Sequence, residues 1–146
     1  MRSEDMIDTH PEPPVIDGAV LAAAIDACVD CAQACAVCAD ACLGEAEVAK
    51  LASCIRLNLD CADLCQAAAR VASRQQPSEV AVLARTLELC ALACDLCGDE
   101  CERHAGHHEH CRVCMEACRR CEAACQEALR KLPGASTRPV IAAMQH

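Results

Sequence analysis

The chain of 146 residues contains no phenylalanine, tyrosine or tryptophan. Its hydrophobic residues make up 54% of the sequence, and much of that fraction is cysteine and alanine. Because these side chains are small, any helices must either approach one another closely or leave space between them. A sulfur-lined channel is one way to use such space.

Basic residues are also scarce, with 13 Lys and Arg against 22 Asp and Glu, which gives a formal net charge of −9. Nucleic acids and anionic membrane surfaces are bound electrostatically by basic faces, so neither is expected as a partner. An acidic surface keeps a protein soluble, and it attracts cations only as a weaker second effect.

No secretion signal is visible, because residues 1–17 are polar and proline-rich and lack an apolar central stretch. No segment approaches the roughly 20 apolar residues of a membrane helix. We therefore expect a cytoplasmic protein whose thiols are kept reduced. No Ser–His–Asp set, phosphate loop or dinucleotide fingerprint is present either, which predicts that the protein is not an enzyme.

What the sequence does contain is 17 cysteines, grouped in four runs with steps of 3, 4 or 7 residues. Such steps keep side chains on one face of an α-helix, where helical bundles normally place leucine. The runs are Cys28, Cys31, Cys35, Cys38 and Cys42; Cys54, Cys61 and Cys65; Cys90, Cys94, Cys97 and Cys101; and Cys111, Cys114, Cys118, Cys121 and Cys125.

The pattern predicts four long helices, which span residues 17–43, 45–73, 79–104 and 108–131. Gly44 and Gly106 lie at helix ends, Pro133 ends the last helix, and Ser78 is a suitable N-cap for the third. The connections are short, which makes successive helices antiparallel neighbours. We therefore predict an all-α fold, an antiparallel up-down-up-down four-helix bundle with a cysteine-lined core.

Residues 17–132 would form this bundle as one domain. Residues 1–16 would be a partly ordered N-terminal extension with a short helical turn around Met6. Residues 133–146 would be a C-terminal tail, with a second short turn at 140–144.

The two ends of this bundle are predicted to differ. One end, called the leucine end below, gathers the apolar residues Leu21, Ile25, Ala68, Leu83, Leu87, Leu129 and Leu132. The other, called the histidine end, holds the turns at Gly44 and Gly106, where the cysteine spacing continues to His104 and to His107 or His108.

Several chemistries could explain a core of thiols. Disulfides within a helix would be strained, because residues one turn apart have Cβ atoms about 5–6 Å apart and a disulfide needs about 3.8 Å. Interhelical disulfides stay possible, although the cysteine count is odd. An inert core gains nothing over alanine or leucine and is oxidisable. A redox-active thiol protein stays an alternative, but no C-x-x-C opens a helix in a βαβ setting.

Soft thiolates favour Cu(I), Zn(II) and iron–sulfur clusters. No cysteine is followed by proline, as in common iron–sulfur runs. Zinc takes four ligands in a tetrahedron, usually from loops, yet layers of four helices could supply them, so a zinc or general metal buffer remains an alternative. Cu(I) accepts two or three sulfur ligands and thiolates can bridge ions, so capacity could approach one ion per thiol, roughly 17.

The C-x-x-C-x-x-x-C-x-x-C segments of the first and last helices, with cysteine ladders on the two helices between them and histidines at one end, resemble the bacterial copper storage proteins. In lacking a visible export signal, the sequence is similar to members of the cytosolic branch of that family. The resemblance covers about residues 17–131. It implies a four-helix bundle that stores and detoxifies many Cu(I) ions, usually within a homotetramer. It also implies that all 17 cysteines are ligands, with His104 and one or both of His107 and His108 at the open end.

Two further polar residues remain ambiguous from the spacing. Asn58 lies between Cys54 and Cys61 at steps of 4 and 3, so it could face the core and contact a sulfur, or it could face solvent. We include it among the candidate metal-site residues. His110 falls off the spacing of the last helix and is predicted to be exposed.

Overall fold

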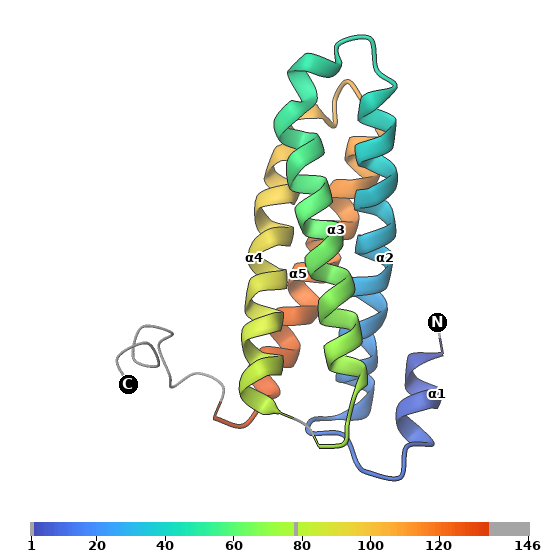
Figure 1. Ribbon diagram of the computed structural model, residues 1–146, viewed down its shortest axis with the longest axis vertical. Helices are drawn as coiled ribbons and strands as arrows, with labels where there is room; N and C mark the ends of the chain where they lie inside the picture. Colours follow the sequence, from blue (N-terminus) through green and yellow to red (C-terminus); the bar gives the residue numbers. More distant parts are fainter. Residues whose placement is uncertain (1, 78, 135–146) are drawn as a thin grey trace.

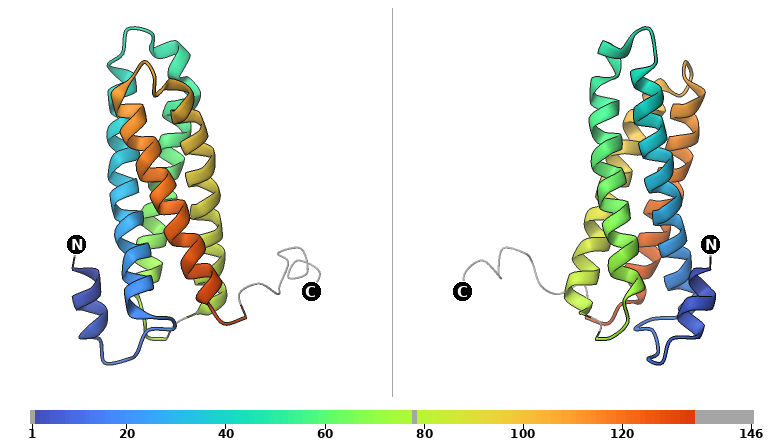
Figure 2. Two further views of the ribbon diagram at one scale, coloured as in Figure 1. Left: turned by 180° about the vertical axis from the view of Figure 1, so that it is seen from behind. Right: turned by 45° about the vertical axis from the view of Figure 1, so that its right-hand side comes forward.

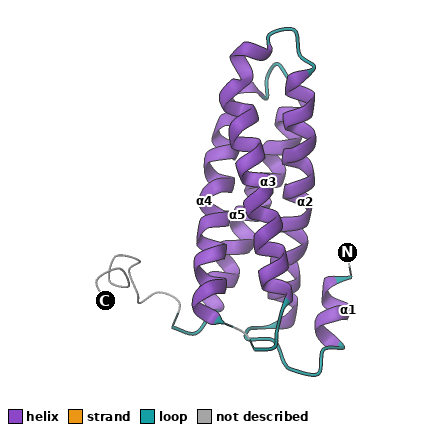
Figure 3. Ribbon diagram, in the orientation of Figure 1, coloured by secondary structure: helices purple, strands orange, loops and turns teal. Residues whose placement is uncertain are grey.

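The computed structural model describes residues 2–77 and 79–134, and all the regular secondary structure in that part of the chain is helical. Four long helices run side by side along one axis, and a short helix lies near the N-terminus (Figures 1 and 3). The elements in chain order are α1 (Ser3–Asp8), α2 (Gly18–Leu43), the 3₁₀ helix η1 (Val48–Leu51), α3 (Ala52–Ser73), α4 (Val80–His104) and α5 (Glu109–Lys131).

Successive long helices are antiparallel neighbours, which confirms the predicted up-down-up-down bundle. Helix α2 packs against α3 and α5, and α4 packs against the same two helices, so the four form a closed square around a common axis (Figure 2). The inward faces carry the cysteine runs, and the core therefore consists mainly of sulfur and small apolar side chains.

The predicted helix boundaries hold to within one residue except at the start of the second helix. The carboxylate of Asp17 caps α2 by accepting a hydrogen bond from the backbone N–H of Val20 at 3.1 Å. The second predicted helix begins later than expected, because the chain reverses after Gly44 and passes through η1 before α3 starts at Ala52. Buried Leu51 anchors this turn against the core.

The proposed cap at Ser78 lies outside the described residues. Helix α4 follows Glu79, whose side chain makes no capping hydrogen bond. The predicted turn at residues 140–144 lies outside the described residues as well.

The leucine end is closed by apolar packing, as predicted. Leu21, Ala68 and Leu87 are fully buried. Ile25, Leu83 and Leu132 expose 6% or less. Leu129 is half-buried against the same cluster. Leucine, isoleucine and alanine side chains from the four helices fill the axis here.

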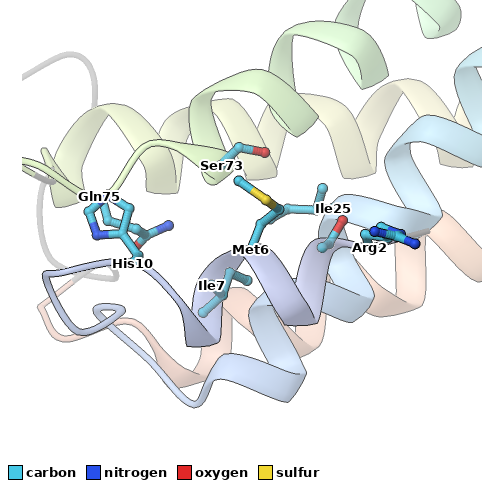
Figure 4. A pocket seen from close by; sticks show the side chains of 8 residues that line it. Arg2, Met6, Ile7, His10, Ile25, Ser73 and Gln75 are labelled. Carbon is cyan, nitrogen blue, oxygen red and sulfur yellow. The ribbon is translucent and has the colours of Figure 1, made fainter.

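Helix α1 confirms the predicted turn around Met6 and packs beside the first turns of α2. Ile7 is buried in the core cluster, and Ser3 Oγ donates a hydrogen bond to Asp26 Oδ1 at 2.5 Å. Between α1, Ile25 and Ser73 lies an open cavity of about 310 Å³, into which Met6 projects (Figure 4). This segment therefore covers the side of the bundle near its leucine end.

We expected no segment to approach the apolar length of a membrane helix. Helix α2 does so, because by length and composition it could span a membrane. Alanine and cysteine make up most of its length, and both count as apolar. Its cysteine face is buried among the other three helices. Helices in the core of a bundle pass the same test, and the packing of α2 corresponds to such a helix.

Candidate metal centre

All 17 cysteines lie among the described residues and all are free thiols. Each exposes 1% or less of its surface. They come from all four long helices, because steps of 3 and 4 residues place every sulfur on the inward face. The structure therefore brings together, in one core, every cysteine that the sequence indicated.

Neighbouring sulfur atoms form a continuous column along the bundle axis. Closest contacts between helices include 3.5 Å from Cys90 to Cys65 and 3.6 Å from Cys28 to Cys125. Groups of four sulfurs lie within 4.8 Å of one another along the column, and five of them illustrate it. These groups are Cys28, Cys90, Cys121 and Cys125; Cys31, Cys65, Cys94 and Cys121; Cys31, Cys35, Cys61 and Cys118; Cys35, Cys97, Cys114 and Cys118; and Cys38, Cys42, Cys54 and Cys111.

These sulfur–sulfur distances suit metal ions better than disulfides. A disulfide joins sulfurs at about 2.05 Å, so covalent pairing would require the packed helices to move. A metal ion about 2.3 Å from each of two sulfurs separates them by at most about 4.6 Å, and by about 4.0 Å in a trigonal site. Adjacent groups also share sulfurs, such as Cys31 and Cys118. A shared sulfur can bridge two ions, so the column can hold a chain of linked sites.

Burial opposes ionisation of the thiols near the histidine end. Removal from water raises the pKa of the Cys42 thiol to about 12, and the pKa of Cys111 is raised by the same cause. A buried thiolate is costly unless a cation accompanies it, whereas a metal ion can replace the thiol proton without leaving a net negative charge. The core can therefore accept cations that bind sulfur strongly enough to displace protons.

Asn58 faces the core and not the solvent, which decides between the two positions that the sequence left open. Its side chain is fully buried. Its amide oxygen accepts from the thiols of Cys97 at 3.0 Å and Cys114 at 3.1 Å, with Cys101 at 3.6 Å. Its amide nitrogen lies 3.5 Å from the sulfur of Cys54. Asn58 thus occupies a position in α3 where a further cysteine would face the column.

The histidine end holds four imidazoles around the turns at Gly44 and Gly106. His108 precedes α5, and its ring stacks on that of His110 with centroids 5.5 Å apart. His104 ends α4 and lies 3.2 Å from a carboxylate oxygen of Glu100. His107 is exposed. Within the described chain, neither His104 nor His107 has a recorded contact with a sulfur.

The prediction that His110 is exposed was wrong. His110 Nδ1 lies 3.4 Å from the sulfur of Cys38 and 3.6 Å from that of Cys111, so it is the imidazole in contact with the thiols. Burial lowers the pKa of His110, but its hydrogen bonds to Cys38 and Glu45 outweigh that effect and raise it. The signal was present in the sequence, because His110 lies four residues before Cys114 and so shares its face of α5.

Comparisons with known proteins agree with this geometry. Residues 18–130 match the family model described as "Csp: Copper storage protein". The copper storage protein Ccsp from Streptomyces lividans, loaded with 10 copper equivalents, has a TM-score of 0.87 and 52% identity, covering 89% of this chain and 99% of that one.

Two further solved structures are similar. A five-copper form of the cytosolic Streptomyces lividans protein has a TM-score of 0.78 and 56% identity, covering 79% of this chain and 96% of that one. The metal-free copper storage protein 3 of Bacillus subtilis has a TM-score of 0.63 and 36% identity, covering 73% and 96%. With the family model matched over most of its length, the chain belongs to the copper storage protein (Csp) family.

Proposed function

We propose that this protein stores and detoxifies Cu(I) in the cytosol by binding many ions to the thiols inside its bundle. The observation that carries the proposal is the continuous column of 17 buried free cysteines. Cu(I) prefers soft sulfur ligands and low coordination numbers, which pairs and bridges of thiolates provide. The similarity to copper-loaded and cytosolic relatives supports the same function and compartment. The protein is a metal store and not an enzyme.

Copper would enter at the histidine end, because the leucine end is closed by packed side chains. His110, Cys38 and Cys111 form the outermost set in which imidazole and sulfur meet. From there ions would move along the column by exchange between neighbouring thiolates. Each bound ion would release a thiol proton, so loading would keep the core close to neutral.

The proposed ligand set comprises the 17 cysteines of residues 17–132, with His110 added at the histidine end. Asn58 can offer its amide oxygen to an ion held by Cys97 and Cys114. His104 and His108 would act at the opening, next to the carboxylates of Glu100 and Glu45. His107 would have the smallest role because it is exposed and outside the helices.

Anaerobic titration of the reduced protein with Cu(I) tests this function, in competition with a chelator of known affinity. We expect saturation at well above four ions per chain. A zinc-type buffer with four thiols per ion would stop near four ions, and a parallel zinc titration measures that alternative. Saturation with one or two copper ions would rule out storage as the role.

We also propose that the chain forms a homotetramer, as the family resemblance implies. Leu89, Leu92 and Leu96 form an exposed stripe on the outer face of α4, with Val82 one heptad before Leu89. Such a stripe is typical of a surface that is covered in an assembly. Light scattering on the wild type and on Leu92→Glu measures the assembly, and a wild type that is monomeric at micromolar concentration would contradict it.

A further inference from the structure

Glu45 joins two histidines at the opening of the sulfur column. It lies in the turn after α2, and its Oε1 atom is 3.0 Å from His110 Nε2 and 3.2 Å from His108 Nδ1. These contacts connect the α2–α3 turn to the start of α5. A glutamate side chain ordinarily carries its negative charge at neutral pH, so Glu45 presents a carboxylate to both rings.

This contact determines which nitrogen of His110 is free. A carboxylate only accepts hydrogen bonds, so the nitrogen that faces it must carry a proton. In the neutral ring, a proton held at Nε2 by Glu45 leaves the lone pair on Nδ1. Nδ1 is the atom that faces the sulfurs of Cys38 and Cys111. Glu45 thus holds the ring with its metal-binding nitrogen directed into the column.

The three facing atoms have the spacing of a three-coordinate site. The sulfurs of Cys38 and Cys111 are 4.0 Å apart, and His110 Nδ1 lies 3.4 and 3.6 Å from them. With metal–sulfur bonds of about 2.3 Å and a metal–nitrogen bond of about 2.0 Å, trigonal geometry gives about 4.0 Å between sulfurs and about 3.7 Å from sulfur to nitrogen. Little movement is therefore needed to receive an ion.

The second carboxylate at this end provides an internal comparison. Glu100 is 3.2 Å from His104 Nε2, but that ring contacts no sulfur in the described part of the chain. Only the pair of Glu45 and His110 combines a carboxylate on one ring nitrogen with thiols on the other, among the described residues. The distinguishing feature is thus the position of the ring between an acceptor and the sulfur column.

We propose that Glu45 is a positioning residue for copper uptake, which fixes His110 so that Nδ1, Cys38 and Cys111 receive the incoming ion. This inference rests on the proposed storage function and adds a residue that does not itself bind the metal. Hydrogen-bonded partners of this kind fix ring orientation and tautomer in metal sites, and their loss typically costs about 10–100-fold in metal affinity.

The first test examines the copper-free protein by ¹⁵N NMR of its imidazoles under reducing conditions. In the wild type we expect a slowly exchanging Nε2–H signal from His110. Glu45→Ala should lose this protected signal, whereas Glu45→Gln keeps an acceptor oxygen and should retain it. Glu47→Ala is the matched control, because Glu47 is exposed in the same turn and pairs with Lys50 at 2.8 Å.

The second test follows the Nδ1 resonance of His110 while chelator-buffered Cu(I) is added. The free Cu(I) concentration needed for half-saturation should rise about 10-fold or more in Glu45→Ala and stay at the wild-type value in Glu47→Ala. The total number of ions bound should be unchanged in both variants, because the cysteines inside the column are intact.

The outcomes separate this inference from the storage function. If Glu45→Ala behaves like Glu47→Ala in either experiment, Glu45 does not position His110 for copper and the inference is overturned. If the wild type itself binds only one or two ions, the storage function fails, and the imidazole signal still decides whether Glu45 holds His110.

Discussion

The two ends of the bundle contain the same kind of helix and have opposite character. At the leucine end, Leu21 and Leu87 fill the axis and exclude water. At the histidine end, the axis meets half-buried imidazoles and carboxylates such as His110 and Glu45, which remain partly accessible. We therefore expect the leucine end to contribute to stability without metal and the histidine end to be where the column exchanges ions with solvent.

Copper loading should produce the largest change and act on the sulfur column more than on the leucine end. An ion that binds only the folded state adds about 4 kcal/mol to the free energy of unfolding when its free concentration is about 1,000 times its dissociation constant. We expect the unfolding temperature to rise by at least about 10 °C, measured by anaerobic calorimetry. Removal of copper with a chelator should reverse the rise, and equal unfolding temperatures with and without copper would contradict the proposed loading.

Leu87→Ala should separate stability from metal binding. Leu87 is fully buried, so its truncation should lower the free energy of unfolding of the metal-free protein by about 2–5 kcal/mol. The copper capacity should stay the same. Leu59→Ala, at a position 48% exposed on α3, is the matched control and should change stability by less than about 0.5 kcal/mol. A large loss of copper capacity in Leu87→Ala would show that the two ends are not independent.

Asn58→Ala should affect the polar interior of the column more weakly. The variant removes the acceptor for the thiols of Cys97 and Cys114 and leaves a small void, which should cost about 1–3 kcal/mol in the metal-free protein. Chemical denaturation under reducing conditions measures this cost. An unchanged free energy of unfolding would show that the hydrogen bonds from these thiols contribute nothing to stability.

His107→Ala should have the smallest effect and would sharpen the assignment of the histidine end. Because His107 is exposed and has no recorded sulfur contact, copper uptake should stay within about twofold of the wild type. His110→Ala is the comparison, and there uptake at the outermost site should fall about 10-fold or more. Stopped-flow measurement of Cu(I) transfer from a chelator gives the uptake rates of both variants. Equal rates for His107→Ala and His110→Ala would show that His110 does not take part in copper uptake.

The sequence alone was sufficient for the bundle and the sulfur column. Cysteine steps of 3 and 4 residues are a local property of a helix, so they place Cys31 or Cys118 on the inward face whatever the neighbouring helices are. Short connections between long helices then leave few topologies. The leucine end followed from the same periodicity, because Leu21 and Leu87 extend the cysteine faces.

Only the tertiary structure decided what surrounds the opening of the column. Which thiols Asn58 contacts depends on how α3 packs against α4 and α5, because Cys97 and Cys114 belong to those helices and spacing within one helix does not specify them. The contact of Glu45 with His110 joins residues 65 positions apart. It depends on the path of the turn after α2, which brings Glu45 next to the first turn of α5. Contacts across such turns form from the packing of whole helices, so spacing within one helix does not predict that Glu45 meets His110.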